Sequence, residues 1–175
     1  MKSFEELESL WQAAARSPTG RGVVREICRR LPGGVHEALE TGEITQELGL
    51  VGDRWSSAND PERLSQITFM NATAAACVEH AGSPARAAGD NFFVDLDVSE
   101  GGLPVGARVQ IGSALLEVTA EPHLGCKKFR ERFGADAMRW VNDKDHRSER
   151  RRGVNLRVLR AGSVRVGDAI SVSEL

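Results

Sequence analysis

The chain has 175 residues, a length that favours one compact domain with a real hydrophobic core over two domains of ordinary size. Hydrophobic residues make up 41% and charged residues 27%, an ordinary globular composition that excludes a disordered, collagen-like or coiled-coil chain. Aromatic residues make up 5% and the formal net charge is -2, so we expect neither base stacking on exposed rings nor bulk electrostatic binding to nucleic acid.

The chain is predicted to begin with an amphipathic helix over residues 3–15. Apolar residues from Phe4 to Ala14 recur there at steps of three and four, and Ser3 and Glu6 have the spacing of a capping box. The Ser-Pro-Thr-Gly sequence at residues 17–20 ends this helix. We therefore divide the chain into an N-terminal helical segment, residues 1–19, and a main domain, residues 20–175.

Short runs rich in β-branched residues, separated by Gly, Pro or Asp, predict that most of the main domain is β structure. Two predicted helices interrupt it: a short Ala-rich helix that Asn71 caps and that ends near His80, and a helix over 127–141 with one apolar face. Similar Val-Gly corners at 105–106 and 166–167 lead into strands, as the bends of a small closed barrel require. The predicted strands start at Val23 and cover 65–69, 91–96, 108–111, 115–119, 154–159 and 169–172, with an extended segment at 44–48. The predicted fold is mainly β, a closed or partly closed barrel with a few peripheral helices.

The cysteines and the apolar segments indicate the compartment. Three cysteines without a C-x-x-C pair favour free thiols, and free thiols favour a reducing environment. The first residues lack the apolar run of a signal peptide, and no stretch is long enough and apolar enough to span a membrane. We expect a cytoplasmic protein that does not associate with membranes.

The most informative stretch is residues 121–134, where Cys126 follows a Pro and Gly turn and precedes a predicted helix. Sulfur chemistry needs the thiolate, whereas a free thiol with a pKa of about 8.5 is mostly protonated at neutral pH. A helix N-terminus and the cations Lys127 and Lys128 favour the anion, and His123 could accept the thiol proton. The alternative is that Cys126 is a small packed residue, which is how we interpret Cys28 and Cys77.

Positive charge is concentrated late in the chain. Ten Lys and Arg residues and five Asp and Glu residues lie between Lys127 and Arg152, so this segment has a net charge of +5 and the rest of the chain -7. Arg151 and Arg152 suit bidentate capture of phosphate, and Gly153 allows close approach of the backbone. We predict that folding brings these arginines and Cys126 to one rim, as a phosphate pocket with a nucleophile. The alternative is a solvated loop.

A series of short motifs resembles, in its order, the signature of the MOSC domain, the module named after the C-terminal part of molybdenum cofactor sulfurase. The resemblance runs from about Gly20 to Val172 and is closest to small stand-alone bacterial members. Many members have His where this chain has Trp55, so no ligand or proton-transfer role is carried over to that position. The motifs are Gly52-Asp53-Arg54-Trp55, Gln66-Ile67-Thr68, Gly89-Asp90-Asn91-Phe92-Phe93-Val94, Leu103-Pro104-Val105-Gly106, Ile111-Gly112, Glu117-Val118-Thr119, Cys126, Arg152-Gly153-Val154 and residues 162–168.

The resemblance implies a barrel of the pyruvate-kinase-barrel type and a role in handling the molybdenum cofactor, molybdopterin, or its sulfur. Cys126 would carry sulfur as a persulfide or ligate molybdenum, with His123 as its catalytic partner. The residues expected to bind the cofactor are Arg54, Asn91, Lys127, Lys128, Arg151 and Arg152. A pyridoxal-phosphate-dependent cysteine desulfurase would supply sulfur, or a molybdoenzyme or electron-transfer protein would be the partner. The oligomeric state stays open.

Two other functions remain open from the sequence. One is a molybdenum-dependent reductase that acts on N-hydroxylated substrates with electrons from a partner. The other is a non-catalytic module that binds an anionic partner through the basic segment 127–152. A mononuclear metal site at His123 and Cys126 is disfavoured, because only two ligands are visible and a structural site needs about four.

Overall fold

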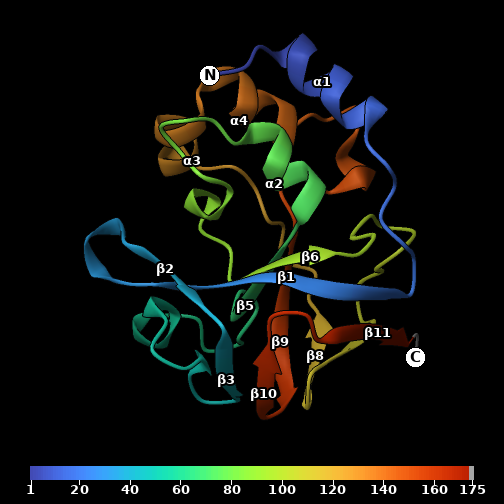
Figure 1. Ribbon diagram of the computed structural model, residues 1–175. Coiled ribbons are helices and arrows are strands. Elements are labelled where there is room, and N and C mark those ends of the chain that lie inside the picture. The colour runs from blue at the N-terminus through green and yellow to red at the C-terminus, as the bar shows by residue number, and fades with distance from the viewer. Residues whose placement is uncertain (174–175) are drawn as a thin grey trace.

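The chain folds into a closed β-barrel with helices over one end (Figure 1). The computed structural model describes residues 1–173. The barrel strands are β1 (Arg21–Arg30), β5 (Ile67–Asn71), β6 (Phe92–Asp95), β7 (Arg108–Ile111), β8 (Ala114–Val118), β9 (Val154–Arg160) and β11 (Ala169–Ser173). Their order around the barrel is β1-β11-β7-β8-β9-β5-β6, and β6 pairs with β1 again. Antiparallel pairing joins all these neighbours except β5 and β6, which are parallel.

The barrel interior is filled by the inward-facing side chains of the strands. Burial alternates along β7 and β8 with the two-residue period of a strand that is covered on one face. Phe69 and Phe92 meet edge to face inside, with ring centroids 5.5 Å apart. Gly106 and Gly167 have φ angles of 87° and 92°, so both Val-Gly corners turn the chain where the sequence predicts. The predicted mainly β, closed barrel is confirmed.

A second, smaller sheet and several short helices surround the barrel. The strand β2 (His36–Leu39) pairs with the second half of β1, and β3 (Thr41–Thr45) pairs with both β4 (Gly49–Leu50) and β10 (Gly162–Arg165). The 3-10 helices are η1 (Pro32–Gly34), η2 (Arg54–Ser57), η3 (Ala85–Ala88) and η4 (Arg147–Glu149).

The helices α1 (Phe4–Ala13), α2 (Ala72–Val78), α3 (Lys127–Phe133) and α4 (Ala135–Val141) gather above one end of the barrel (Figure 1). The capping box of Ser3 and Glu6 is present, and the Asn71 side chain accepts hydrogen bonds from the first amides of α2. These helices share a second core, which includes Leu7, Phe129 and Trp140.

The prediction of one helix over 127–141 is wrong. Gly134 has φ 94° and ψ 170°, outside the helical region, and it separates α3 from α4. The apolar face is correct, because Phe129, Phe133, Ala137 and Trp140 are all buried. The break lets two short helices pack against each other instead of extending as one rod.

Arg151 joins the N-terminal helix to the rest of the molecule. Its side chain is 1% exposed, its guanidinium pairs with Glu8 at 2.8 Å and Glu149 at 2.7 Å, and it stacks on Trp140. The predicted rim that includes Arg151 is therefore not formed, because this arginine is committed to helix packing.

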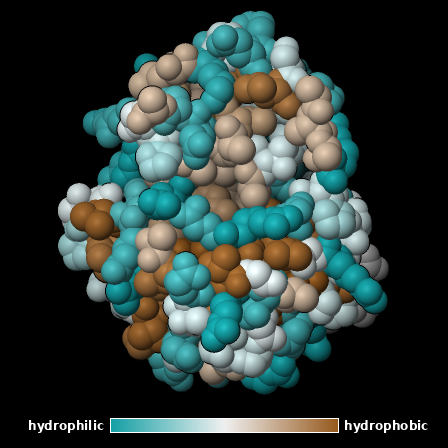
Figure 2. All heavy atoms as spheres, viewed as in Figure 1, coloured by the Kyte–Doolittle hydropathy of each residue, from teal (hydrophilic) through white to brown (hydrophobic). Residues whose placement is uncertain are grey.

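Figure 2 shows one face of the molecule, with hydrophilic and apolar residues mixed over the helices and a band of strongly apolar residues across the barrel below them. Within residues 1–173, no helix combines the length and the hydrophobicity needed to cross a membrane.

Candidate functional site

Cys126 is the N-cap residue of α3 and is exposed, whereas Cys28 and Cys77 are buried. Partial burial opposes ionisation of Cys126, but the amides of Phe129 and Lys128 and the charge of Arg152 outweigh it and lower the pKa of the thiol. Burial raises the pKa of Cys28 to about 12, and it also raises the pKa of Cys77. Of the three thiols, Cys126 is the one that is both accessible and disposed to ionise.

Three cations, Arg30, Arg54 and Arg132, are here called the cation cluster. Arg54 is close enough to Arg30, Arg132 and Cys126 for their charges to act on it. Burial and the neighbouring charges of Arg30 and Arg132 lower the pKa of Arg54, while a Cys126 thiolate opposes this shift. Within residues 1–173, neither Arg54 nor Arg132 forms an ion pair with a carboxylate. Uncompensated guanidinium groups around a thiolate are suited to binding an anion.

His36 borders the cation cluster. A Cβ atom at Gly89 would lie 3.4 Å from Nε2 of His36 and 3.7 Å from a terminal nitrogen of Arg132, so these groups face one small space. Burial and the charges of Arg132, Arg54 and Arg30 lower the pKa of His36 to about 4. His36 is therefore neutral at physiological pH, and an anion at this place would favour its protonated form.

A buried polar network supports the cation cluster from inside. Arg30 pairs with Asp53 through nitrogen–oxygen distances of 2.7–3.2 Å, and Asn91 donates to Asp53 and accepts from Thr68 and Arg30. Burial opposes ionisation of Asp53, but the hydrogen bonds and charge of Arg30 outweigh it and lower the pKa of this carboxyl. Asn91 is fully buried, so it holds Arg30 in place and does not reach a ligand.

His123 belongs to a second polar group, in which Asp90 lies between His123 and Arg152 and contacts both. Nε2 of His123 lies 2.6 Å from Asp90, and the other oxygen of Asp90 lies 2.5 Å from Arg152. Arg152 also donates to the carbonyl of Ala88 and lies over the ring of Phe129. Burial opposes ionisation of Asp90, but Arg152 and His123 outweigh it and lower its pKa to about 2. No hydrogen bond joins His123 to Cys126 within residues 1–173, so the predicted proton transfer between them lacks a direct contact.

The segment that carries His123 and leads to Cys126 is fixed by two asparagines. The Asn142 side chain accepts from the amide of Gly125 at 2.7 Å and donates to its carbonyl at 3.1 Å. Asn155 donates to the carbonyl of Glu121 at 3.1 Å. This segment separates two cavities, and His123 and Leu124 line both of them.

The structure brings together Cys126, Arg54 and Arg152 from the predicted site, and it leaves Asn91 and Arg151 outside it. Lys127 and Lys128 are exposed in the first turn of α3, and the Lys127 side chain is 90% exposed. Arg132 and His36 also belong to the site, although the sequence does not indicate either of them. They come from α3 and β2, and no local motif connects them with Cys126. In residues 1–173, no group of three or more His, Cys, Asp and Glu side chains is arranged to hold a metal ion.

Comparison with known proteins identifies the family. The sequence profile of the MOSC domain matches residues 64–171, more than half of the chain. The chain belongs to the MOSC domain family. This MOSC protein resembles the YuaD protein from Bacillus subtilis, with a TM-score of 0.60 and 16% identity over 89% of this chain and 97% of that one. It also resembles YiiM from Geobacillus stearothermophilus, with a TM-score of 0.54 and 16% identity over 87% and 73% of the two chains. It resembles YiiM from Escherichia coli with a TM-score of 0.54 and 17% identity, over 86% of this chain and 70% of that one.

At these identities the structural matches establish the fold of the MOSC protein and nothing finer. Comparison with curated protein sequences gives no match.

Proposed function

We propose that this MOSC protein binds the molybdenum cofactor, with Cys126 as the ligand of molybdenum and with Arg54 and Arg132 on the anionic part of the cofactor. The observation that supports the proposal is the exposed, acidified thiol of Cys126 beside two arginines that have no carboxylate partner within residues 1–173. Thiolate is a soft metal ligand, and guanidinium groups suit phosphate, so the residues fit this cofactor. When bound, the cofactor supplies the redox chemistry of its metal.

The protein's own residues have separate tasks in this proposal. The cation cluster binds and orients the anionic part, and Arg30 is held by Asp53 for this purpose. Arg152 and the amides of Lys128 and Phe129 keep Cys126 in the thiolate form. Asn142 fixes Gly125, the residue before the thiol.

The second candidate function uses the same thiol as a sulfur carrier. Exposure of Cys126 favours it, because a persulfide must be reached by both its donor and its acceptor protein. A cysteine desulfurase would then be the donor. Use of Cys126 as a metal ligand requires instead an electron-transfer partner or a molybdoenzyme partner, and reduction of an N-hydroxylated substrate is the reaction to assay.

The test is to purify the protein rapidly from cells that make molybdenum cofactor and to measure the molybdenum content and the mass of the Cys126 peptide. We expect bound molybdenum in the wild type and its loss in Cys126→Ser. The double variant Arg54→Gln, Arg132→Gln should lose molybdenum but keep a reactive Cys126 thiol. Arg165→Gln, at an exposed arginine of β10, is the matched control and should keep molybdenum.

The two candidate functions give different results in this test. A mass increase of one sulfur atom on Cys126 without molybdenum favours the carrier. Absence of both molybdenum and added sulfur from the wild-type protein would contradict both candidates.

A further inference from the structure

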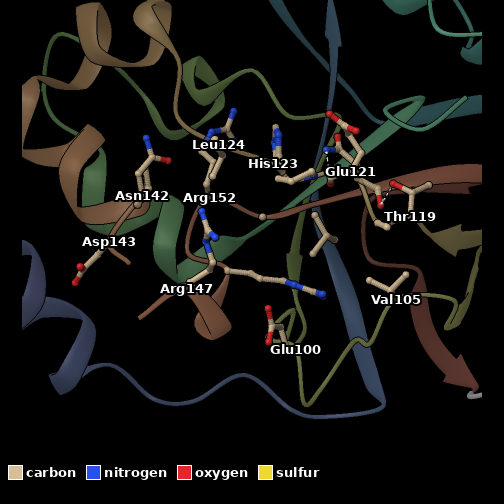
Figure 3. Close-up of a pocket in the computed structure, with 17 residues that line it drawn as sticks. Glu100, Val105, Thr119, Glu121, His123, Leu124, Asn142, Asp143, Arg147 and Arg152 are labelled. Carbon is tan, nitrogen blue, oxygen red and sulfur yellow. Dashed lines mark hydrogen bonds between the residues drawn. The ribbon is translucent and has the colours of Figure 1, made fainter. Parts of the chain in front are cut away.

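On one side of the segment that carries His123 lies a cavity of about 220 Å³, here called the His123 cavity (Figure 3). His123, Leu124 and Arg152 lie on one side of it, and Glu100 and Val105 lie on the opposite side (Figure 3). Cys126 does not line it. An apolar cavity of about 150 Å³ can hold benzene, so the His123 cavity is large enough for a molecule with one ring.

The walls of the His123 cavity favour a largely apolar ligand. Leu124 is 50% exposed and Val105 is 53% exposed, and both line the cavity, so their apolar surfaces are available to a ligand. Val141 adds a buried apolar surface. The charged groups in the walls balance, because three arginines and three carboxylates line the cavity: Arg147, Arg150, Arg152, Glu100, Glu121 and Asp143. The net charge of the lining residues therefore favours neither an anionic nor a cationic ligand.

His123 adds one directional polar group to these walls. Asp90 is ionised and accepts the proton of Nε2, so the lone pair of His123 is on Nδ1. Within residues 1–173, Nδ1 has no hydrogen-bond partner, and it is not among the polar atoms that are shut off from solvent. Burial and the charge of Arg152 outweigh Asp90 and lower the pKa of His123, which keeps the ring neutral at physiological pH.

We propose that the His123 cavity binds a small, largely apolar ligand that donates a hydrogen bond from an N–H or O–H group to Nδ1 of His123. The Asp90–Arg152 pair fixes the tautomer and the orientation of the ring, and Val105, Leu124 and Val141 contact the apolar part of the ligand. This site shares Arg152 with the surroundings of Cys126, but it uses neither the thiol nor the cation cluster.

A pair of fluorinated probes tests the proposal by fluorine NMR. The probe para-fluorophenol can donate a hydrogen bond, whereas para-fluoroanisole, in which a methyl group replaces the hydroxyl hydrogen, cannot. We expect the phenol to bind the wild-type protein about fivefold more tightly than the anisole, the value for one hydrogen bond. Equal affinities, or no saturable binding of the phenol, would overturn the proposal.

Five variants locate the site. His123→Leu should lose the preference for the phenol, whereas His123→Gln should retain part of it, because the amide can donate to Asp90 and still present an acceptor. Val105→Trp fills the His123 cavity from an exposed position and should abolish binding, whereas Ala58→Trp, in the cavity on the other side of the segment, should not. Cys126→Ser should bind as the wild type does, which separates this proposal from the one for the cofactor. Binding that survives Val105→Trp, or a preference that survives His123→Leu in a folded protein, contradicts it.

Discussion

The three cysteines of this chain differ in whether their surroundings stabilise or destabilise the thiolate. Cys28 and Cys77 are enclosed by apolar neighbours in the core between the helices, where a thiolate would lose its hydration. Cys126 is at a helix start, next to solvent, amides and arginines. One sequence thus contains two structural thiols and one chemically available thiol.

We predict that iodoacetamide modifies Cys126 at least about tenfold faster than Cys28 or Cys77 in the native protein at neutral pH, because alkylation requires an accessible thiolate. Peptide mass spectrometry after a short pulse of reagent measures the three rates. Guanidinium-denatured protein is the control, and all three cysteines should react at similar rates there. Comparable native rates for Cys77 and Cys126 would contradict the assignment of Cys126.

At the scale of elements, the sequence predicts those features that depend on neighbouring residues. The strands with alternating burial, the capped helices and the two Val-Gly corners all follow from local pattern. The sequence does not indicate β2, because its residues show no polar–apolar alternation and only pairing with β1 defines the strand. It does not indicate the break at Gly134 either, because the apolar face continues across it. Arg132 and His36 could not be assigned to the site, since tertiary structure alone brings them together.

The attachment of α1 depends on Arg151, and we predict that Arg151→Met lowers the free energy of unfolding by about 2 kcal/mol. In this variant Glu8 and Glu149 lose their charged partner. Because each of these side chains is 26% exposed and stays partly hydrated, the loss of stability is smaller than the roughly 3–5 kcal/mol expected for a fully buried pair. Urea titration at neutral pH measures the change. The control is Arg25→Gln on the barrel, whose largely exposed pair with Asp95 should contribute less than about 1 kcal/mol. Equal effects of the two substitutions would show that Arg151 does not hold the helix.

For the molecule as a whole, acid should destabilise the fold in two steps. The folded-state pKa of His36 is about 4, below its ordinary value of 6.5, so the unfolded chain binds more protons between these two values. The free energy of unfolding therefore falls as the pH decreases from 6.5 towards 4. Asp90, with a folded-state pKa of about 2 against an ordinary 3.8, adds a second loss below pH 3.8.

We predict that His36→Gln loses less stability than the wild type between neutral pH and about pH 4.5, since it removes the group that takes up the proton on unfolding. Urea midpoints across this range measure the difference. His146→Gln serves as the control: its bond to Asp143 raises the pKa of His146, so it contributes with the opposite sign. Parallel curves for His36→Gln and the wild type would contradict the role given to His36.

The seam that closes the barrel joins residues near opposite ends of the described chain, since Arg21–Val23 pair with Ala169–Ser171. During synthesis, the first residues of β1 therefore stay without their β11 partner until residues 169–171 have been translated. Throughout that time the nascent chain exposes an unpaired strand edge, the kind of surface that invites aggregation and that chaperones bind. Closure of the barrel thus requires that β11 has been translated.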